Sequence, residues 1–352
     1  MPGNRPCIRL RASGGRIEKA SVASYGMYGT LVNGLRGLDY GLALKAAEKI
    51  DGRISHSHSM LFALCAEEAF SVRVPERAVY IRMLFAELER IHNHLFNMAE
   101  TVREAGDLRL FLSMMRCQRL LLSCLEKITG GTIIYSVNVI GGVGLDISSG
   151  QKNEIARTAD IIASRAENFR KYFYGEGFIS GACRGVGVLE PASALRLSAS
   201  GFIGRASGLG TDLRKKEPVL AYDRIKFEAA VCDGGDVLSR LKVCLAEVKE
   251  SCFAVKQILA ALPSGAVSVK YNIPSASAEV LNRCESPLGV EEYRLSCRGR
   301  SNSCRITPSV FSSLGCVAAM LEKESEEDIG LILSSVGMSR RLGLVDIEIY
   351  ES

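Results

Sequence analysis

The 352-residue chain contains no tryptophan, only four histidines, and twelve cysteines that never form a Cys-x-x-Cys pair. The absence of that spacing gives little support to a structural zinc or iron–sulfur site built by this chain alone. The first twenty residues lack an apolar segment of the kind that signal peptides carry. No apolar run reaches the roughly 18–20 residues that a membrane span needs. We therefore expect neither export nor membrane insertion.

An excess of one charge sign is also missing, since 44 Lys and Arg stand against 39 Asp and Glu. No basic block is long enough, and no aromatic pattern is present, to indicate a nucleic-acid partner. What the chain does have is 47% hydrophobic residues and a mean hydropathy of +0.12, enough for a substantial core. Several cysteines lie within apolar helical patterns, so we expect them to be small buried hydrophobes in a reducing cytosol.

Apolar residues recur at steps of three and four in several segments, which is typical of helices with one buried face. This pattern predicts helices at 75–106, 107–129, 149–172, 235–262, 308–322 and 328–338. The first two are expected to run antiparallel through a bundle core. Strands are expected within residues 1–30 and 267–304, and the Gly-rich stretch 175–235 reads as irregular. The predicted class is mainly α with small β parts (α+β), in a single domain over residues 1–352, because no internal repeat appears and the long helices share a core.

A cluster of polar residues, Asp51, Arg53, His56 and His58, occupies eight positions of the segment 49–59. In a buried cavity such a cluster could pass protons or bind a small polar ligand. The alternative is a capping aspartate with two histidines at a helix start, bonded to the backbone. The His-x-His spacing puts the two imidazoles on different helix faces, which argues against a metal site with two histidines.

Charged and polar side chains also interrupt the apolar pattern of the helix predicted at 75–106, namely Arg82, Glu87, Arg90 and His94. Buried charges need partners to avoid a desolvation cost of several kcal/mol. We expect structural ion pairs, with proton conduction between a cavity and a subunit interface as the alternative. The glycines between 201 and 210 lack the strand and helix context of a dinucleotide loop, so nicotinamide binding is not expected.

Four separated motifs together resemble one protein family. They are His58 to Glu68 running into Val74-Pro75-Glu76-Arg77-Ala78; Tyr80-Ile81-Arg82-x-Leu84-Phe85-Ala86-Glu87-Leu88-x-Arg90-Ile91-x-Asn93-His94-Leu95; Ser136-Val137-Asn138-x-Ile140-Gly141-Gly142-Val143; and Arg205-Ala206-Ser207-Gly208 with Asp212-Leu213-Arg214-Lys215-x-x-Pro218, Tyr222-Asp223 and Gly234-Gly235-Asp236. The chain resembles, over about residues 25–350, the catalytic large subunit of energy-converting nickel-iron hydrogenases and its relative, the quinone-site D subunit of respiratory complex I.

The resemblance implies a mainly helical large-subunit fold that docks onto an iron–sulfur small subunit at the cytoplasmic face of a membrane arm. Hydrogenases of this kind hold nickel and iron with four thiolates, two from an early and two from a late motif. Here Asp51, Ile54, Ser339 and Leu342 stand at those positions. Soft thiolates select these metals, and neither Ile54 nor Leu342 has a donor atom, so we expect no nickel-iron site.

The quinone-site subunits of complex I also lack these cysteines, carry aspartate at the place of Asp51 and use the vacated cavity for a quinone headgroup. They are expected to have tyrosine after that aspartate and a histidine in an N-terminal hairpin. This chain has Gly52 instead, and no histidine precedes His56. Glu104 falls where complex I has an acidic residue near the quinone pocket, although a helix-end glutamate exposed to water is the alternative.

The favoured hypothesis is therefore a subunit of a membrane-associated, multi-subunit oxidoreductase, peripheral at the cytoplasmic face. It would bind no cofactor itself and would line a cavity beside the [4Fe-4S] cluster of the small subunit. There Asp51, Arg53, His56, His58 and Glu104 would couple electron arrival to proton or ion movement, or to reduction of a small acceptor.

Three alternatives remain. In the first the chain is a silent scaffold whose old cavity is closed by Ile54 and Leu342. In the second it is a quinone-reducing subunit, and in the third a hydrogenase with unusual ligands. A polar, water-sized pocket with perturbed carboxylates favours the active cavity, whereas tight apolar packing favours the scaffold.

Overall fold

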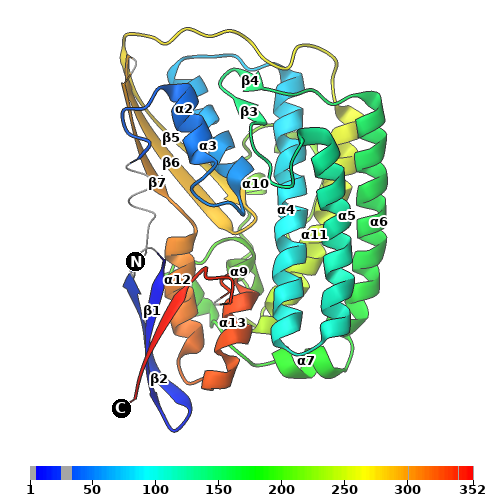
Figure 1. Cartoon of the computed structure of the whole chain (residues 1–352), viewed down its shortest axis with the longest axis vertical. Coiled ribbons are helices and arrows are strands. Elements are labelled where there is room, and N and C mark those ends of the chain that lie inside the picture. Colours follow the sequence, from blue (N-terminus) through cyan, green and yellow to red (C-terminus); the bar gives the residue numbers. More distant parts are fainter. Residues whose placement is uncertain (1–4, 25–33, 300, 340, 352) are drawn as a thin grey trace.

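The computed structural model describes residues 5–24, 34–299, 301–339 and 341–351. In this part of the chain, long helices stand side by side on one side of the molecule, and two small sheets lie on the other (Figure 1). The predicted class, mainly α with small β parts, is confirmed. The single domain over residues 1–352 stays a prediction.

Four long helices form the bundle, and all four were expected from the apolar periodicity. They are α4 (Glu76–Glu104), α5 (Leu108–Thr129), α6 (Ser149–Tyr174) and α11 (Val237–Ala261). Helix α5 begins where the Asp107 side chain accepts a hydrogen bond from the Leu110 amide, and it ends at Gly130 in the left-handed conformation. The N-terminus of α6 is closed by a reciprocal pair of hydrogen bonds between Ser148 and Gln151.

Helix α4 is the centre of the bundle and is buried on nearly all sides. It packs against α5, α11 and α13 (Ile329–Ser335), so its charged residues as well as its apolar ones are buried. Helices were predicted at 308–322 and 328–338, and both are present. Helix α12 (Val310–Leu321) lies beside α13. Because α4 has no free face, any polar side chain on it needs a partner within the protein.

Three antiparallel strands form the upper sheet, β5 (Ser277–Ser286), β6 (Gly289–Arg298) and β7 (Ser301–Thr307), in that order. Strands were expected within 267–304. Helix α3 (Ser55–Ala69) packs against β5 and β6, with α2 (Tyr40–Ala47) beside it (Figure 1). The turn between β5 and β6 points toward the middle of the molecule, where the loop between α2 and α3 also lies.

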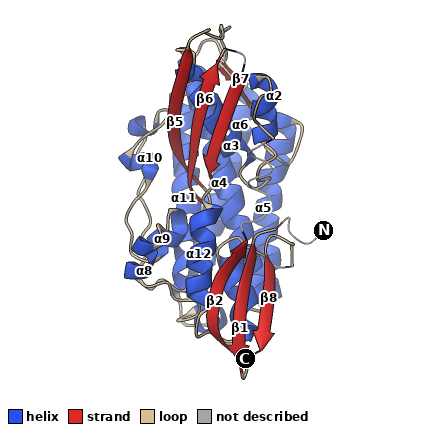
Figure 2. Cartoon of the chain, turned by 90° about the vertical axis from the view of Figure 1, so that its left-hand side faces the viewer, coloured by secondary structure: helices blue, strands red, loops and turns tan. Residues whose placement is uncertain are grey.

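The lower sheet joins segments from both ends of the chain (Figure 2). Strand β1 (Cys7–Ser13) pairs antiparallel with β2 (Arg16–Ser24) and parallel with β8 (Asp346–Glu351). The first two strands were expected and are confirmed within the described residues, while 25–33 lie outside them. Strand β8 was not expected, because its partner lies more than 300 residues away in the sequence.

Residues 175–235, expected to be irregular, contain several short helices. They are α7 (Phe178–Cys183), α8 (Pro191–Arg196), α9 (Gly201–Ala206), α10 (Leu213–Lys216) and a 3-10 turn, η1 (Tyr222–Arg224). A second 3-10 turn, η2 (Glu326–Asp328), precedes α13. Two short strands, β3 (Asn138–Val139) and β4 (Gly142–Val143), form a small hairpin near the start of α4. Elements this short have too few residues to show a period.

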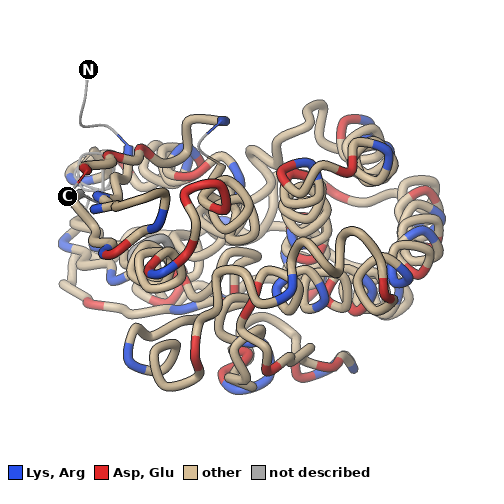
Figure 3. The backbone as a smooth tube through the Cα atoms, turned by 90° about the horizontal axis from the view of Figure 1, so that it is seen from below, with Lys and Arg blue, Asp and Glu red and all other residues tan. Residues whose placement is uncertain are grey.

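The apolar core divides into two clusters, a large one around the bundle and a smaller one between α2, α3 and the upper sheet. All twelve cysteines are free and eleven are buried, so the prediction that they act as small hydrophobes is confirmed. Basic and acidic residues are interleaved along the backbone (Figure 3). None of the described helices is both long enough and apolar enough to cross a bilayer.

Candidate functional site

The loop between α2 and α3 is tied to the segment that follows α13. The Asp51 carboxylate accepts from the Arg53 amide at 2.9 Å and pairs with its guanidinium, with Oδ2 and Nη2 2.5 Å apart. Nη1 of Arg53 donates to the carbonyl of Gly337 at 2.6 Å, across a sequence separation of 284 residues. The early and late motifs therefore meet in space.

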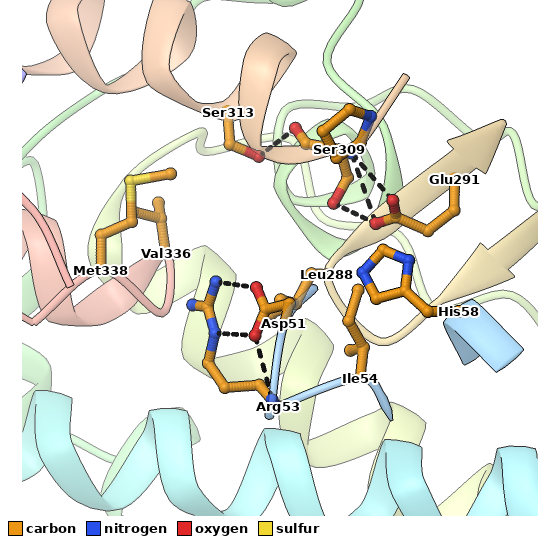
Figure 4. Close-up of a pocket in the computed structure, with 11 residues that line it drawn as sticks. Asp51, Arg53, Ile54, His58, Leu288, Glu291, Ser309, Ser313, Val336 and Met338 are labelled. Carbon is orange, nitrogen blue, oxygen red and sulfur yellow. Dashed lines mark hydrogen bonds and ion pairs between the residues drawn. The ribbon is translucent and has the colours of Figure 1, made fainter. Parts of the chain in front are cut away.

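A small cavity lies at this meeting point (Figure 4). The space open to the centre of a water molecule is about 10 Å³, room for about one water. Its walls come from the α2–α3 loop, α3, the β5–β6 turn, β6, the start of α12 and the segment after α13. The lining residues are Asp51, Arg53, Ile54, His58, Leu288, Glu291, Pro308, Ser309, Ser313, Val336 and Met338. The cavity is water-sized, as the hypothesis of an active cavity expects, and six of its eleven lining residues are polar or charged, but apolar atoms make up most of its wall.

His58 faces this cavity with one ring nitrogen (Figure 4). Its Nδ1 lies 2.8 Å from the hydroxyl of Tyr293, while Nε2 is buried and has no hydrogen-bond partner among the described residues. Burial lowers the pKa of His58 to about 4, so the ring is neutral at pH 7. When the Tyr293 hydroxyl donates to Nδ1, the N–H sits on Nε2 and points into the cavity.

Two carboxylates of the cavity differ in their partners. Burial alone would raise the pKa of Asp51, yet the charge and hydrogen bonds of Arg53 hold it below its usual value. Glu291 on β6 accepts from the Ser309 hydroxyl at 2.6 Å and forms no ion pair with a described Lys or Arg. Burial raises the pKa of Glu291 to about 7. Sequence reasoning missed this residue, although Glu291 shares the inward alternation of Tyr293 and Leu295 on β6.

Two of the predicted site residues lie outside the cavity. His56 points to the other side of α3, where Nε2 is 2.9 Å from the Arg82 carbonyl oxygen and Nδ1 is 3.1 Å from Asn138. Burial lowers its pKa to about 3. Glu104, at the end of α4, pairs with Arg103 at 3.0 Å. The structure thus brings together Asp51, Arg53 and His58, and the prediction that the two histidines lie on different faces is confirmed.

Of the four positions where hydrogenases carry metal-binding cysteines, two line the cavity and two do not. Asp51 and Ile54 line the cavity, whereas Ser339 is buried beside it and accepts from the Leu342 amide at 3.3 Å. Leu342 is 45% exposed, so it does not close the cavity as the scaffold hypothesis expected. A hydrocarbon side chain at Ile54 and an outward Leu342 cannot ligate a metal, so the residues present do not fit a nickel-iron centre.

Three of the side chains that interrupt the apolar pattern of α4, Arg82, Glu87 and Arg90, form buried ion pairs, and the fourth, His94, hydrogen-bonds to Glu247 at 2.8 Å. Arg82 donates to both carboxylate oxygens of Glu67, at 2.7 and 2.6 Å. The others join one network in which carboxylates alternate with guanidinium groups, made of Glu87, Arg90, His94, Arg205, Asp212, Arg214, Glu247 and Glu285. The predicted structural pairing is therefore confirmed. Arg90 also donates to the Glu285 and Ser286 carbonyls, which ties α4 to the end of β5.

Glu89 on α4 caps the start of α3, accepting from the amides of His56 and Ser57 at 2.8 and 3.1 Å. Burial raises the pKa of Glu89 to about 8. In the folded chain Glu89 therefore keeps its proton at pH values where the unfolded chain, with an ordinary pKa of about 4.3, has lost it. Its contribution to stability is therefore lost as pH rises from about 4.3 to 8. We expect Glu89→Gln, neutral at every pH, to flatten this fall in the free energy of unfolding, measured by urea titration at about pH 5 and pH 8.

The buried histidines act in the opposite direction, since their lowered pKa values favour the folded chain as pH rises. The informative quantity is thus the difference between Glu89→Gln and the unchanged chain. Glu279→Gln, an exposed residue of β5 paired with Arg294, is the matched control and should leave the slope as it is. Equal slopes for Glu89→Gln and the unchanged chain would contradict a protonated Glu89.

Comparisons with known proteins find one matching family and several relatives. The family described as respiratory-chain NADH dehydrogenase, 49 Kd subunit, matches residues 104–275. The C/D subunit of NADH-quinone oxidoreductase from Phocaeicola vulgatus is 29% identical over 75% of this chain and 51% of its own length. The D 2 subunit of the same enzyme from Koribacter versatilis is 31% identical over 67% of this chain and 58% of its own. The D subunit of F(420)H(2) dehydrogenase from Methanosarcina mazei is 26% identical over 80% and 78%. The chain thus spans little more than half of the first two relatives.

Proposed function

Since the chain belongs to the family of the D subunit of complex I, the 49 kDa subunit, we propose that it is a peripheral subunit of a membrane-associated, multi-subunit oxidoreductase. The named relatives are subunits of NADH-quinone oxidoreductase and F(420)H(2) dehydrogenase, which supports other subunits as its partners. In this proposal those partners are an iron–sulfur small subunit and membrane-arm subunits, and the complex sits at the cytoplasmic face of the cell membrane.

The cavity is the proposed reaction site, and the buried, unpartnered Nε2 of His58 is the observation that carries it. A [4Fe-4S] cluster held by the small subunit would supply electrons, and this chain would bind no cofactor. His58 would donate a hydrogen bond to an oxygen of the acceptor, and Arg53 would add a positive charge held in place by Asp51. Neutral donors and a fixed cation stabilise the negative charge that builds up on an acceptor oxygen during reduction.

The size of the cavity favours a second candidate, the silent scaffold. Pockets for small molecules usually measure about 300–1,000 Å³, far more than this cavity offers. In the active proposal the acceptor is very small, or the wall formed by Val336 and Met338 moves when it binds. Reduction of a quinone as in complex I has less support, because Gly52 replaces the expected tyrosine and the β1–β2 hairpin carries no histidine.

Purification of the native complex tests whether the chain is a subunit of a larger oxidoreductase. We expect an iron–sulfur small subunit and membrane-arm proteins to copurify with the chain, and elemental analysis to find iron without nickel. Recovery of the chain alone would contradict the proposal. Nickel in stoichiometric amount would instead support a hydrogenase with unusual ligands.

A further inference from the structure

Glu291 is a fully buried carboxyl group whose hydrogen-bond donors are all uncharged. Its Oε1 accepts from the Ser309 hydroxyl at 2.6 Å and from the Ser286 hydroxyl at 3.3 Å, and the Ser309 amide lies 3.3 Å from both carboxyl oxygens. Glu285, six residues earlier, is also buried but pairs with Arg205 at 2.7 Å. Two neighbouring glutamates therefore share burial and differ in the presence of a cation.

Burial without a cation partner accounts for the raised pKa of Glu291. A buried carboxylate without a cation has a desolvation cost that hydroxyl and amide donors offset only in part. Glu285 is compensated by a guanidinium, whereas Glu291 gains from staying a neutral acid near pH 7. Glu291 also lines the cavity that His58 faces (Figure 4), so its proton lies next to the space where an acceptor oxygen would sit.

We propose that Glu291 is the proton-exchange residue of this cavity, which gives a proton to an oxygen held there and later takes one back. In the step, the O–H bond of the Glu291 acid breaks and an O–H bond forms on the cavity oxygen, either of water or of the reduced acceptor. Glu291 is left as a carboxylate that the Ser309 donors stabilise, and no electron moves. The inference rests on the proposed function only for the use of this proton.

The groups that face Glu291 support an exchange near neutrality. From the α2–α3 loop it faces the paired Asp51 and Arg53, from α3 the neutral His58, and from β5 the thiol of Cys284. The Asp51 charge adds to burial in raising the pKa of Glu291 to about 7, while the Ser309 hydrogen bonds lower it. The Arg53 side chain lines the cavity and is 19% exposed, so water that reaches this side chain can return the proton to Glu291, while the guanidinium itself stays protonated.

Infrared spectroscopy of the full chain labelled with carbon-13 glutamate tests this directly. We expect protonated glutamate absorbance with two components, one that disappears with a midpoint near pH 7 and one, from Glu89, with a midpoint near pH 8. The first component is lost in Glu291→Gln and persists in the buried control Glu89→Gln, which removes the second. In Ser309→Ala the midpoint of the first component should move upward, because a stabilising donor of the carboxylate is gone. A Glu291 that is ionised from pH 5 upward overturns the proposal. If Glu291→Gln fails to fold, the Ser309→Ala shift decides the question, and an unmoved midpoint overturns it.

Turnover of the purified complex then separates this inference from the proposed function. We expect Glu291→Gln to lower acceptor reduction about 100-fold, the lower end of typical acid–base contributions. Full turnover in Glu291→Gln overturns the role of Glu291 and leaves the proposed function standing. If the complex with the unsubstituted chain does not reduce the acceptor, the proposed function is overturned. The infrared titration then still decides whether Glu291 exchanges a proton.

Discussion

Replacing Arg205 with methionine is expected to destabilise the chain by about 3–5 kcal/mol, the usual result of removing one partner from a buried ion pair. Arg205 is 1% exposed, and its guanidinium donates to Glu247 at 2.9 Å and to Glu285 at 2.7 Å. Methionine keeps much of the volume but leaves these carboxylates without their main cation. Urea titration of the full chain measures the loss as a lower midpoint.

Arg9→Met is the matched control for this experiment. Arg9 makes an ion pair with Glu348 at 2.9 Å, similar in length, but both side chains are about half exposed. Exposed pairs are screened by water, so the midpoint should stay close to that of the unchanged chain. Equal and small effects in the two variants would show that the buried network does not hold the bundle to α9 and β5.

The long helices could be predicted because apolar residues recur along each of them with a helical period. The sequence of α4 also predicted buried ion pairs, because Glu87 and Arg90 interrupt an apolar run and need partners within the protein. What the sequence could not reveal was the identity of those partners. They come from α10, α11 and β5, elements that lie 100 to 200 residues further along the chain.

The cavity was predictable in part. Two residues correspond to about 200° around a helix, so only one of His56 and His58 could face a given site. Glu104 was placed near the cavity by resemblance, yet about three turns of α4 separate it from Asn93, which contacts the loop at Arg53. Glu291 was missed because its role depends on the pairing of β6 with β7, which ends at the start of α12 and so places Ser309 beside Glu291, and local sequence does not reveal this pairing.

His58→Gln is expected to lower acceptor reduction by the complex about 100-fold or more, as loss of a positioned hydrogen-bond donor to a developing negative charge usually does. The glutamine oxygen can still accept from Tyr293, so the fold around α3 should persist. What disappears is the ring nitrogen Nε2 that faces the cavity. His92→Gln is the control, because His92 also lies on a buried helix and bonds to Gln118 at 3.1 Å, but it does not line the cavity.

The most direct test of the account is the ratio of two turnover rates, those of complexes carrying His58→Gln and His92→Gln, measured with the native electron donor and a water-soluble quinone as probe. Both complexes are first shown to contain the same subunits in the same amounts. An active cavity predicts a rate about 100-fold lower for His58→Gln. Equal rates would contradict it and would leave the chain as a scaffold.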